Sequence, residues 1–250
     1  MFFFSFNNGN FFNPICLKEM DGVKLLNRID SKFIFRIELL PDILNELKQH
    51  YRILQIDNNN MMQYETLYFD THNFKLYTDH QNGRLNRYKV RYRKYINSNV
   101  TFFEIKFKNN KKRTIKDRLK QENIEYSINQ DTAKLIDSKT CLNKNELEPK
   151  IWVNYQRITL VNNNLKERLT IDLNLSFLSD DKYKDFPKLV IAELKQGKHE
   201  NSHFIKIMRE HSIHKQSISK YCLGVSSLFD NVKKNNIKPL LLLINKKYYD

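Results

Sequence analysis

The chain has 250 residues, 40% of them hydrophobic, and contains only 5 glycines and 5 prolines. This length and apolar content suit a globular protein of one or two domains, and the scarcity of glycine and proline excludes a collagen-like or linker-rich chain. The formal net charge of +15 indicates an anionic partner, which by composition alone is nucleic acid, an acidic membrane surface or a phosphorylated small molecule.

Segments whose residues alternate with a period of two predict about eight β-strands. Aromatic and β-branched side chains are frequent in them, and asparagine-rich turns separate several of them. The predicted strands cover residues 33–35, 51–56, 64–69, 87–95, 102–108, 151–161, 168–173 and 189–195.

The predicted helices are fewer and cover residues 39–50, 130–136, 202–211 and 217–229. Pro41 stands near the start of the first, where a proline is compatible with a helix. Because strands outnumber helices and rarely alternate with them, we expect an antiparallel α+β fold rather than a βαβ fold. We expect an amino-terminal extension at residues 1–23, one domain over residues 24–230 and a tail over residues 231–250.

The cysteines and the chain ends bear on the cellular compartment. Cys16, Cys141 and Cys222 are far apart and odd in number, which argues against a disulfide framework or a zinc site and favours a reducing compartment. The amino-terminal segment has no basic region and no cleavage site of a signal peptide, and the apolar run at residues 240–244 is too short to span a bilayer. We expect a cytoplasmic protein, with a peripheral position at the inner membrane through a membrane-protein partner as an open alternative.

Basic residues share strand faces, because residues i and i+2 of a strand point to the same side. In the strand predicted at residues 87–95, Arg91 and Arg93 share one face with Lys89, and aromatic or aliphatic residues occupy the other face. The same spacing places Glu104 with Lys106 and Lys108, Tyr155 with Arg157, Arg168 with Thr170 and Asp172, and Glu193 with Lys195.

Two interpretations fit these charged faces. A charged strand face normally lies in water. Arginine, however, recurs on these faces and suits bidentate phosphate recognition, and acids stand among the bases, as expected where buried charges must be paired. If the sheet closes with its polar faces inward, the result is a basic tunnel whose apolar faces pack against outer helices.

A series of short segments carries a family resemblance. In chain order they are RIDSKF at 28–33, TLYFDT at 66–71, KVRYR at 89–93, FEIK at 103–106, KDR at 116–118, YQR at 155–157, RLTID at 168–172, AELK at 192–195 and SKYCLG at 219–224. Each segment is weak alone, but their order and spacing resemble the VTC-type polyphosphate polymerase domain, a branch of the CYTH-like triphosphate tunnel metalloenzymes.

The resemblance implies an eight-stranded antiparallel β tunnel, or barrel, with a polar basic interior and peripheral helices. It also implies roles by position. The residues expected to be catalytic through their charge on the phosphates are Lys32, Arg91, Arg93, Lys106, Arg157 and Arg168. The residues expected to bind substrate are Arg28, Lys116, Tyr155, Lys195, Ser219 and Lys220. Glu193 matches the carboxylate that binds the divalent metal, Mn²⁺ or Mg²⁺.

Two positions depart from the pattern of the resembled proteins. The wider superfamily opens with paired acids, and here Arg28 replaces the first of them, which favours the polymerase branch over the hydrolase branch. A second lysine often precedes the one that matches Lys220, and here that position is Ser217, with Lys215 nearby as a substitute.

The resemblance predicts a polymerase that transfers the γ-phosphate of ATP to a growing inorganic polyphosphate chain. Phosphoryl transfer depends mainly on positioning and charge stabilisation, which fits the absence of any convincing Ser/His/Asp or Cys/His arrangement. The expected partners are ATP and polyphosphate, and no nucleic acid. The alternatives are a triphosphatase of the same superfamily and a non-catalytic polyanion sensor; RNA binding would instead require outward-facing bases.

Overall fold

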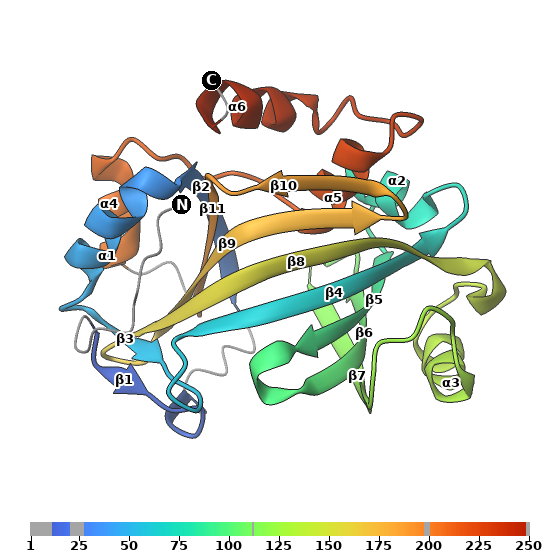
Figure 1. Ribbon diagram of the computed structural model, residues 1–250, viewed down its shortest axis with the longest axis horizontal. Helices are drawn as coiled ribbons and strands as arrows, with labels where there is room; N and C mark the ends of the chain where they lie inside the picture. Colours follow the sequence, from blue (N-terminus) through green and yellow to red (C-terminus); the bar gives the residue numbers. More distant parts are fainter. Residues whose placement is uncertain (1–11, 21–27, 112, 198–200, 249–250) are drawn as a thin grey trace. The chain divides into compact units, whose positions relative to one another are not determined.

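The computed structural model describes residues 12–20, 28–111, 113–197 and 201–248 (Figure 1). The chain divides into two compact units. Unit 1 draws on Met1–Met62, Gln156–Asn174 and Pro187–Ser217, and unit 2 on Gln63–Tyr155, Leu175–Phe186 and Ile218–Asp250. Each unit therefore combines segments that are far apart in the sequence, and the two units are described separately below.

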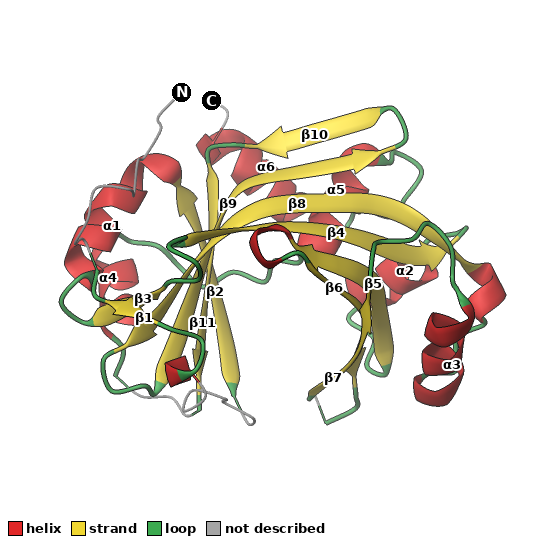
Figure 2. Cartoon of the chain, turned by 60° about the horizontal axis from the view of Figure 1, so that its bottom comes forward, coloured by secondary structure: helices red, strands yellow, loops and turns green. Residues whose placement is uncertain are grey.

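The strands form a sheet of 11 strands, in which the path β2-β11-β9-β8-β4-β5-β6-β7 holds eight and β1, β3 and β10 pair beside it (Figure 2). Every pair with a described register is antiparallel except β1 with β3. The strands are β1 (Pro14–Ile15), β2 (Ile29–Arg36), β3 (Tyr51–Leu54), β4 (Met61–Thr71), β5 (Arg87–Tyr95), β6 (Val100–Lys108), β7 (Thr114–Gln121), β8 (Leu147–Asn162), β9 (Glu167–Ser179), β10 (Lys182–Phe186) and β11 (Leu189–Gln196).

The antiparallel α+β prediction is confirmed, but the predicted closed barrel is not. The strand path runs from β2 to β7, and over the described part of the chain these two strands do not pair with each other, so the sheet is open. The main path does contain eight strands, but they are not the eight strands that the sequence predicted. The predicted set included β3, which lies off the main path, and it missed β7, which lies in a run of high charge.

The helices are α1 (Leu40–Leu47), α2 (Lys75–Gln81), α3 (Gln130–Lys139), α4 (His203–Glu210), α5 (Lys220–Leu228) and α6 (Lys238–Tyr248), with short 3-10 turns at Ile37–Leu39, Ile96–Ser98 and Lys144–Glu146. The predictions for α1, α3, α4 and α5 are confirmed, whereas α2 and α6 were not expected. Three starts are capped by a side chain, because Asn129, Ser202 and Ser219 each accept a hydrogen bond from a backbone N–H in the first turn.

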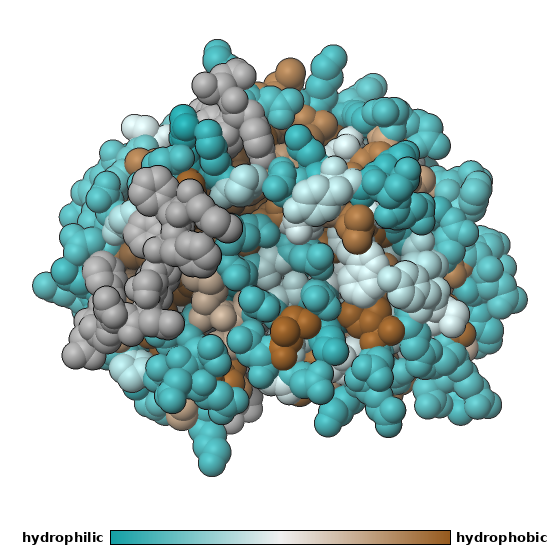
Figure 3. Space-filling view, in the orientation of Figure 1, coloured by the Kyte–Doolittle hydropathy of each residue, from teal (hydrophilic) through white to brown (hydrophobic). Residues whose placement is uncertain are grey.

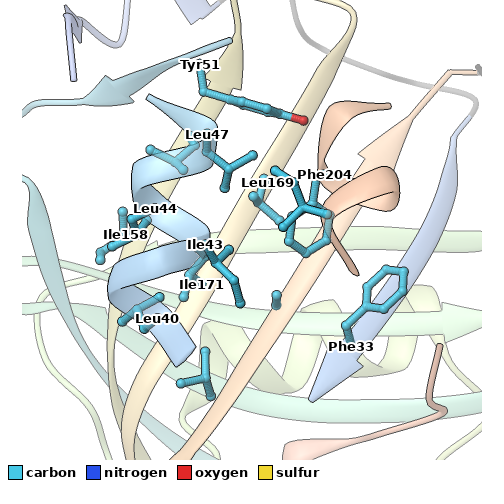
Figure 4. Packing of buried hydrophobic residues seen from close by; sticks show 14 of the residues in the cluster. Phe33, Leu40, Ile43, Leu44, Leu47, Tyr51, Ile158, Leu169, Ile171 and Phe204 are labelled. Atoms are coloured by element: carbon cyan, nitrogen blue, oxygen red, sulfur yellow. The ribbon is translucent and has the colours of Figure 1, made fainter. Parts of the chain in front are cut away.

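The core of unit 1 lies between the strands and the helices α1 and α4. Phe33 of β2, Leu169 and Ile171 of β9, and Ile43 of α1 pack together there (Figure 4). Phe204 of α4 meets Phe33 edge to face, with ring centroids 5.3 Å apart. These strand residues belong to one face of the sheet, so the opposite face of the same strands is left for the polar residues.

Unit 2 repeats this division with other elements. Leu67, Val90, Phe103 and Ile105 of β4, β5 and β6 form a buried cluster with Ile136 of α3. Burial of side chains of this size typically stabilises a fold by about 1.5–3 kcal/mol each. Alternate residues of the same strands therefore face away from this core.

Large hydrophobic residues on the surface are scattered rather than joined. The face in view in Figure 3 is mainly hydrophilic, with apolar atoms in small groups. The exposed large hydrophobics are Leu17, Leu85, Ile115, Tyr126, Leu178, Tyr183 and Leu242. Single exposed residues of this kind are usual on globular proteins. Over the described helices, none is long and apolar enough to cross a membrane.

Candidate anion-binding site

The strand register confirms that the predicted bases of unit 2 share one face. Arg91 of β5 lies opposite Glu104 of β6, and Lys106 of β6 lies opposite both Lys89 of β5 and Lys116 of β7. Directly opposed residues of an antiparallel pair point to the same side. We call Lys89, Arg91, Arg93, Lys106 and Lys116, with Glu104, the unit 2 basic cluster.

Glu104 is the carboxylate around which this cluster is organised. Its side chain is fully buried, and Arg91, itself only 4% exposed, donates from Nε and Nη2 to Oε2 at 2.9 and 2.6 Å. Lys116 forms an ion pair with the other carboxylate oxygen. Although burial opposes ionisation, Arg91, Arg93 and Lys116 hold the pKa of Glu104 well below its usual range. Glu104 is therefore ionised, and one acid balances several bases.

Arg91 is also fixed from β4. Its Nη1 donates to the hydroxyl oxygen of Tyr68 at 2.7 Å, and the ring of Tyr68 stacks on that of Tyr221 of α5. The sequence patterns did not single out Tyr68 or Glu104 as site residues. Tyr68 and Glu104 each lie directly opposite Arg91 on neighbouring strands. A correct prediction of how β5 pairs with β4 and β6 would therefore have identified both residues.

Lys106 differs from the other bases of the cluster. It makes no hydrogen bond or ion pair with any residue that the structure describes. The charge of Arg91, followed by burial and the charge of Arg93, holds the pKa of Lys106 well below its usual range. Glu104, which partly offsets this effect, is already paired with Arg91 and Lys116, so an entering anion would supply Lys106 with a counter-ion.

Three further predicted residues lie beside the cluster. Ser219, at the start of α5, accepts a hydrogen bond from Lys89 Nζ at 2.9 Å. Lys220 Nζ lies 4.8 Å from the ring centroid of Tyr155, and Arg93 lies 5.9 Å from the same centroid. Unit 2 therefore brings together Arg91, Arg93, Lys106, Lys116, Tyr155, Ser219 and Lys220.

Unit 1 carries a second group, the unit 1 basic cluster, defined as Lys32, Arg157, Arg168 and Lys195 with Glu193 and Asp172. Glu193 of β11 lies opposite Lys32 of β2 and opposite Thr170 of β9, and Lys195 lies opposite Asp30 and Arg168. These residues therefore share one face, which is opposite the face that forms the unit 1 core.

Two ion pairs hold this second cluster. Arg157 forms a bidentate pair with Asp172, at 2.5 and 2.8 Å, and Asp172 is only 2% exposed. Glu193 pairs with Lys195. Although burial opposes ionisation, Lys195, Lys32 and Arg157 hold the pKa of Glu193 well below its usual range.

Arg168 and Arg28 are the remaining predicted residues of unit 1. The Nε of Arg168 is buried and finds no hydrogen-bond acceptor within the described residues. Burial and the charges of Arg28 and Arg157 lower the pKa of Arg168. Arg28 pairs with Asp30 at 3.1 Å near the surface. Arg168 therefore holds an unused donor, as Lys106 does in unit 2.

The donor set for a metal is small. Over the described residues, no group of three or more histidine, cysteine, aspartate or glutamate side chains lies close enough to hold an ion. Mg²⁺ commonly takes one or two protein carboxylates and completes its shell with water and substrate phosphates. Glu193 is ionised and offers one carboxylate, so the residues present fit a divalent ion held jointly with phosphate oxygens.

These observations define an antiparallel α+β protein whose clustered cations occupy the strand faces opposite its apolar cores. The VTC domain family matches this sequence over residues 27–229, and the chain belongs to that family. No curated protein sequence matches it.

Solved structures show a similar fold at low sequence identity. A Hippeastrum protein of proposed adenylyl cyclase class, with a dominant triphosphatase activity, is 12% identical with a TM-score of 0.50, over 81% of this chain and 98% of its own. A Vibrio parahaemolyticus protein of proposed adenylate cyclase class is 13% identical with a TM-score of 0.47, over 78% and 97%. A Pyrococcus furiosus protein described as a conserved hypothetical protein is 10% identical with a TM-score of 0.41, over 75% and 94%.

Proposed function

We propose that this protein is an ATP-dependent polyphosphate polymerase, which transfers the γ-phosphate of ATP to the end of an inorganic polyphosphate chain. The observation that carries the proposal is the excess of cations on the strand faces. In the unit 2 basic cluster, five bases accompany the single acid Glu104, and among the described residues Lys106 forms no hydrogen bond or ion pair. A desolvated polyanion requires such counter-charges, and membership of the VTC domain family supports the same substrate class.

Both clusters would act by charge and position. The terminal phosphate oxygen of the chain attacks the γ-phosphorus of ATP, a new P–O bond forms, and the bond between the γ-phosphorus and the oxygen that bridges to the β-phosphate breaks as ADP leaves. The attacking oxygen is already anionic, so the step needs no general base. Arg91, Arg93 and Lys106 in unit 2, and Arg157 and Arg168 in unit 1, would neutralise phosphate oxygens.

Glu193 would supply the protein ligand of Mn²⁺ or Mg²⁺. When bound, such an ion withdraws charge from the phosphate oxygens and helps to orient them. Lys195 and Lys32 keep the Glu193 carboxylate ionised, and thus able to coordinate a metal. The hydroxyl groups of Tyr155 and Ser219 would donate hydrogen bonds to phosphate, and Arg28, Lys116, Lys195 and Lys220 would add charge to the binding site.

The test is incubation of the purified protein with ATP and MnCl₂, followed by gel detection of the product. We expect polyphosphate chains from the wild-type protein and at least about tenfold less from Lys106→Met, the loss expected when a charge-assisted contact is removed. Lys106 is the better target than Arg91, because removing Arg91 would leave Glu104 buried without its main partner.

Lys111→Met is the matched control, since Lys111 is exposed and lies outside both clusters. It should retain the wild-type yield of polyphosphate. Release of orthophosphate without chains would overturn the polymerase proposal in favour of a triphosphatase, and tight polyphosphate binding without turnover would overturn it in favour of a sensor.

A further inference from the structure

Aromatic side chains continue the polar face of unit 2 beyond its basic cluster. Tyr64 of β4 lies opposite Tyr95 of β5, and Phe102 of β6 lies opposite Arg93. The ring of Tyr64 stacks on that of Tyr155 at 5.0 Å and 6°, and meets that of Tyr95 at 5.0 Å and 58°. Tyr95 in turn meets Phe102 edge to face at 6.1 Å. We call Tyr64, Tyr95, Phe102 and Tyr155 the aromatic row.

The aromatic row is not part of the apolar core of unit 2. That core occupies the other strand face and is built from residues such as Leu67, Val90 and Phe103. Tyr155 is buried, but Tyr64, Tyr95 and Phe102 remain half-exposed. Rings that serve only to fill a core would be expected on the opposite face. The exposed parts of Tyr95 and Phe102 can therefore contact a ligand at the edge of the cationic face.

Arg93 joins the aromatic row to the basic cluster. Its guanidinium carbon lies 5.5 Å from the ring centroid of Tyr64, and its Nε donates to Thr66 Oγ1 at 3.3 Å. Along β5 it is also the last member of the series Lys89, Arg91 and Arg93, whose members follow at about 7 Å per two residues. A ligand with anionic phosphates on one side of Arg93 would place its other end beside the rings.

We propose that the aromatic row binds the base of the nucleoside triphosphate by stacking, while the adjacent bases bind its phosphates. This inference rests on the proposed function, and it assigns a subsite for the nucleoside part of the donor. Phosphates and a flat aromatic base are two of the three parts of a nucleotide, with the ribose between them. The same face of unit 2 presents cations and, farther along the strands, half-exposed rings.

Stacking predicts a particular selectivity. Every base has a π-face, so stacking on tyrosine and phenylalanine tolerates different bases and grows with ring area. We therefore expect ATP and GTP to bind with similar affinity and both to bind more tightly than CTP and UTP. Inorganic tripolyphosphate carries the phosphates without a base and should be insensitive to the aromatic row.

The experiment is isothermal titration of the full chain with a non-hydrolysable ATP analogue and with inorganic tripolyphosphate. In Tyr95→Leu, which keeps apolar bulk but removes the ring, the Kd for the ATP analogue should rise roughly five- to a hundredfold. The Kd for tripolyphosphate should stay within about twofold, because stacking contributes nothing to a ligand without a base. Tyr95→Phe, which retains the ring, should keep the affinity for the analogue.

Tyr183→Leu is the matched control, because Tyr183 is an exposed tyrosine of unit 2 in β10, outside the row. It should change neither affinity, and Phe102→Leu provides a second variant should Tyr95→Leu fold poorly by circular dichroism. Equal weakening of both ligands, or no change with either, would refute the base subsite but not the proposal that unit 2 binds phosphate. Failure of the wild-type protein to bind either ligand would refute the proposed function itself.

Discussion

Lys106 illustrates how one side chain can oppose folding and still suit a binding site. It lies between Lys89 and Lys116 on the polar face of unit 2, and the charge of Arg91 is the main reason that its pKa is low. The remaining charged groups around it are Arg93 and Glu104, and Glu104 is already shared between Arg91 and Lys116. Lys106 therefore adds repulsion to the free protein, and a bound anion would remove it.

The first prediction concerns Lys106 and pH. The pKa of Lys106 is lower in the folded protein than in the unfolded chain, so between the two values the unfolded chain holds more protons and stability falls as pH falls. Lys106→Met should therefore raise the Tm, by about 2–4 °C near pH 7 for each 1 kcal/mol of repulsion removed, and by less near pH 10. Circular dichroism melting curves at both pH values measure this. An equal effect at both pH values, or a lower Tm, would contradict it.

The second prediction concerns Glu104. Its removal leaves Arg91 buried with a lost partner, and loss of one member of a buried ion pair typically costs about 3–5 kcal/mol. Glu104→Ala should therefore lower the free energy of unfolding by about that amount in urea titration. Glu122→Ala, at an exposed position, is the control and should stay within about 0.5 kcal/mol of the wild-type value. A small effect of Glu104→Ala would show that Arg91 is solvated in the free protein.

Helix α5 is the element that brings predicted site residues to the strands of unit 2. It carries Ser219 at its amino-terminal cap and Lys220 in its first turn. Tyr221 anchors it, because its hydroxyl donates to the buried carboxylate of Asp70 at 2.5 Å, and Asp70 also accepts from the backbone N–H groups of α2. Gly224 allows its close approach to the side chains of Ile151 and Phe177.

The third prediction concerns Gly224. Alanine usually favours a helix over glycine by about 1 kcal/mol, but a Cβ at this position would lie 2.5 Å from Phe177 Cδ1 and 2.7 Å from Ile151 Cδ1. Overpacking of this kind costs about 1–3 kcal/mol, so Gly224→Ala should destabilise the protein and weaken polyphosphate binding through displacement of Lys220. Urea titration and a binding assay measure the two effects. Ser138→Ala, on the exposed side of α3, is the control and should change the free energy of unfolding by no more than about 0.5 kcal/mol. A stabilised Gly224→Ala would show that the side chains of Phe177 and Ile151 move aside without strain.

Strand β7 shows that a run of charged residues can form a β-strand. Residues 114–121 alternate Lys116, Arg118 and Lys120 with Ile115, Asp117 and Leu119, and they pair with β6 along their length. This segment was not among the predicted strands, and its residues are exposed or only partly buried. The end position of β7 on the strand path explains this composition, since lysines on an edge strand discourage pairing with other chains.

At the scale of the whole molecule, both units carry a basic cluster opposite an apolar core. The net charge of +15 is therefore concentrated at defined faces in each unit as well as spread over the surface. Considering only the part of the chain that the structure describes, Arg168 in unit 1 has an unused donor and Lys106 in unit 2 forms no ion pair. Each unit is thus expected to contribute to polyanion binding.

The fourth prediction compares the two units. Arg168→Met in unit 1 and Lys106→Met in unit 2 should each weaken the binding of long-chain polyphosphate by about 1.5–3 kcal/mol, the range for a hydrogen bond with a charged group. Losses that add within about 0.5 kcal/mol in the double variant are the result expected of residues that do not share a phosphate. Titration of polyphosphate into the wild-type protein, the two single variants and the double variant measures these losses. An unchanged affinity in either single variant would exclude that residue from polyphosphate binding.

The sequence alone determined the two-faced strands. Alternation placed Arg91 with Arg93 and Glu193 with Lys195 on single faces, because side-chain direction in a strand follows the local chain. The same local information predicted α1, α3, α4 and α5 from apolar spacing.

Only the tertiary structure decided which strands pair and which charges meet. Glu104 became the centre of a cluster because β6 lies between β5 and β7, so that Arg91 and Lys116 reach it from both sides. The same pairing places Lys106 where it forms no ion pair with any described residue. The two-residue period of a strand fixes which side each residue faces. Which strands lie next to each other, when they are distant in the sequence, is decided by the free energy of packing the whole chain.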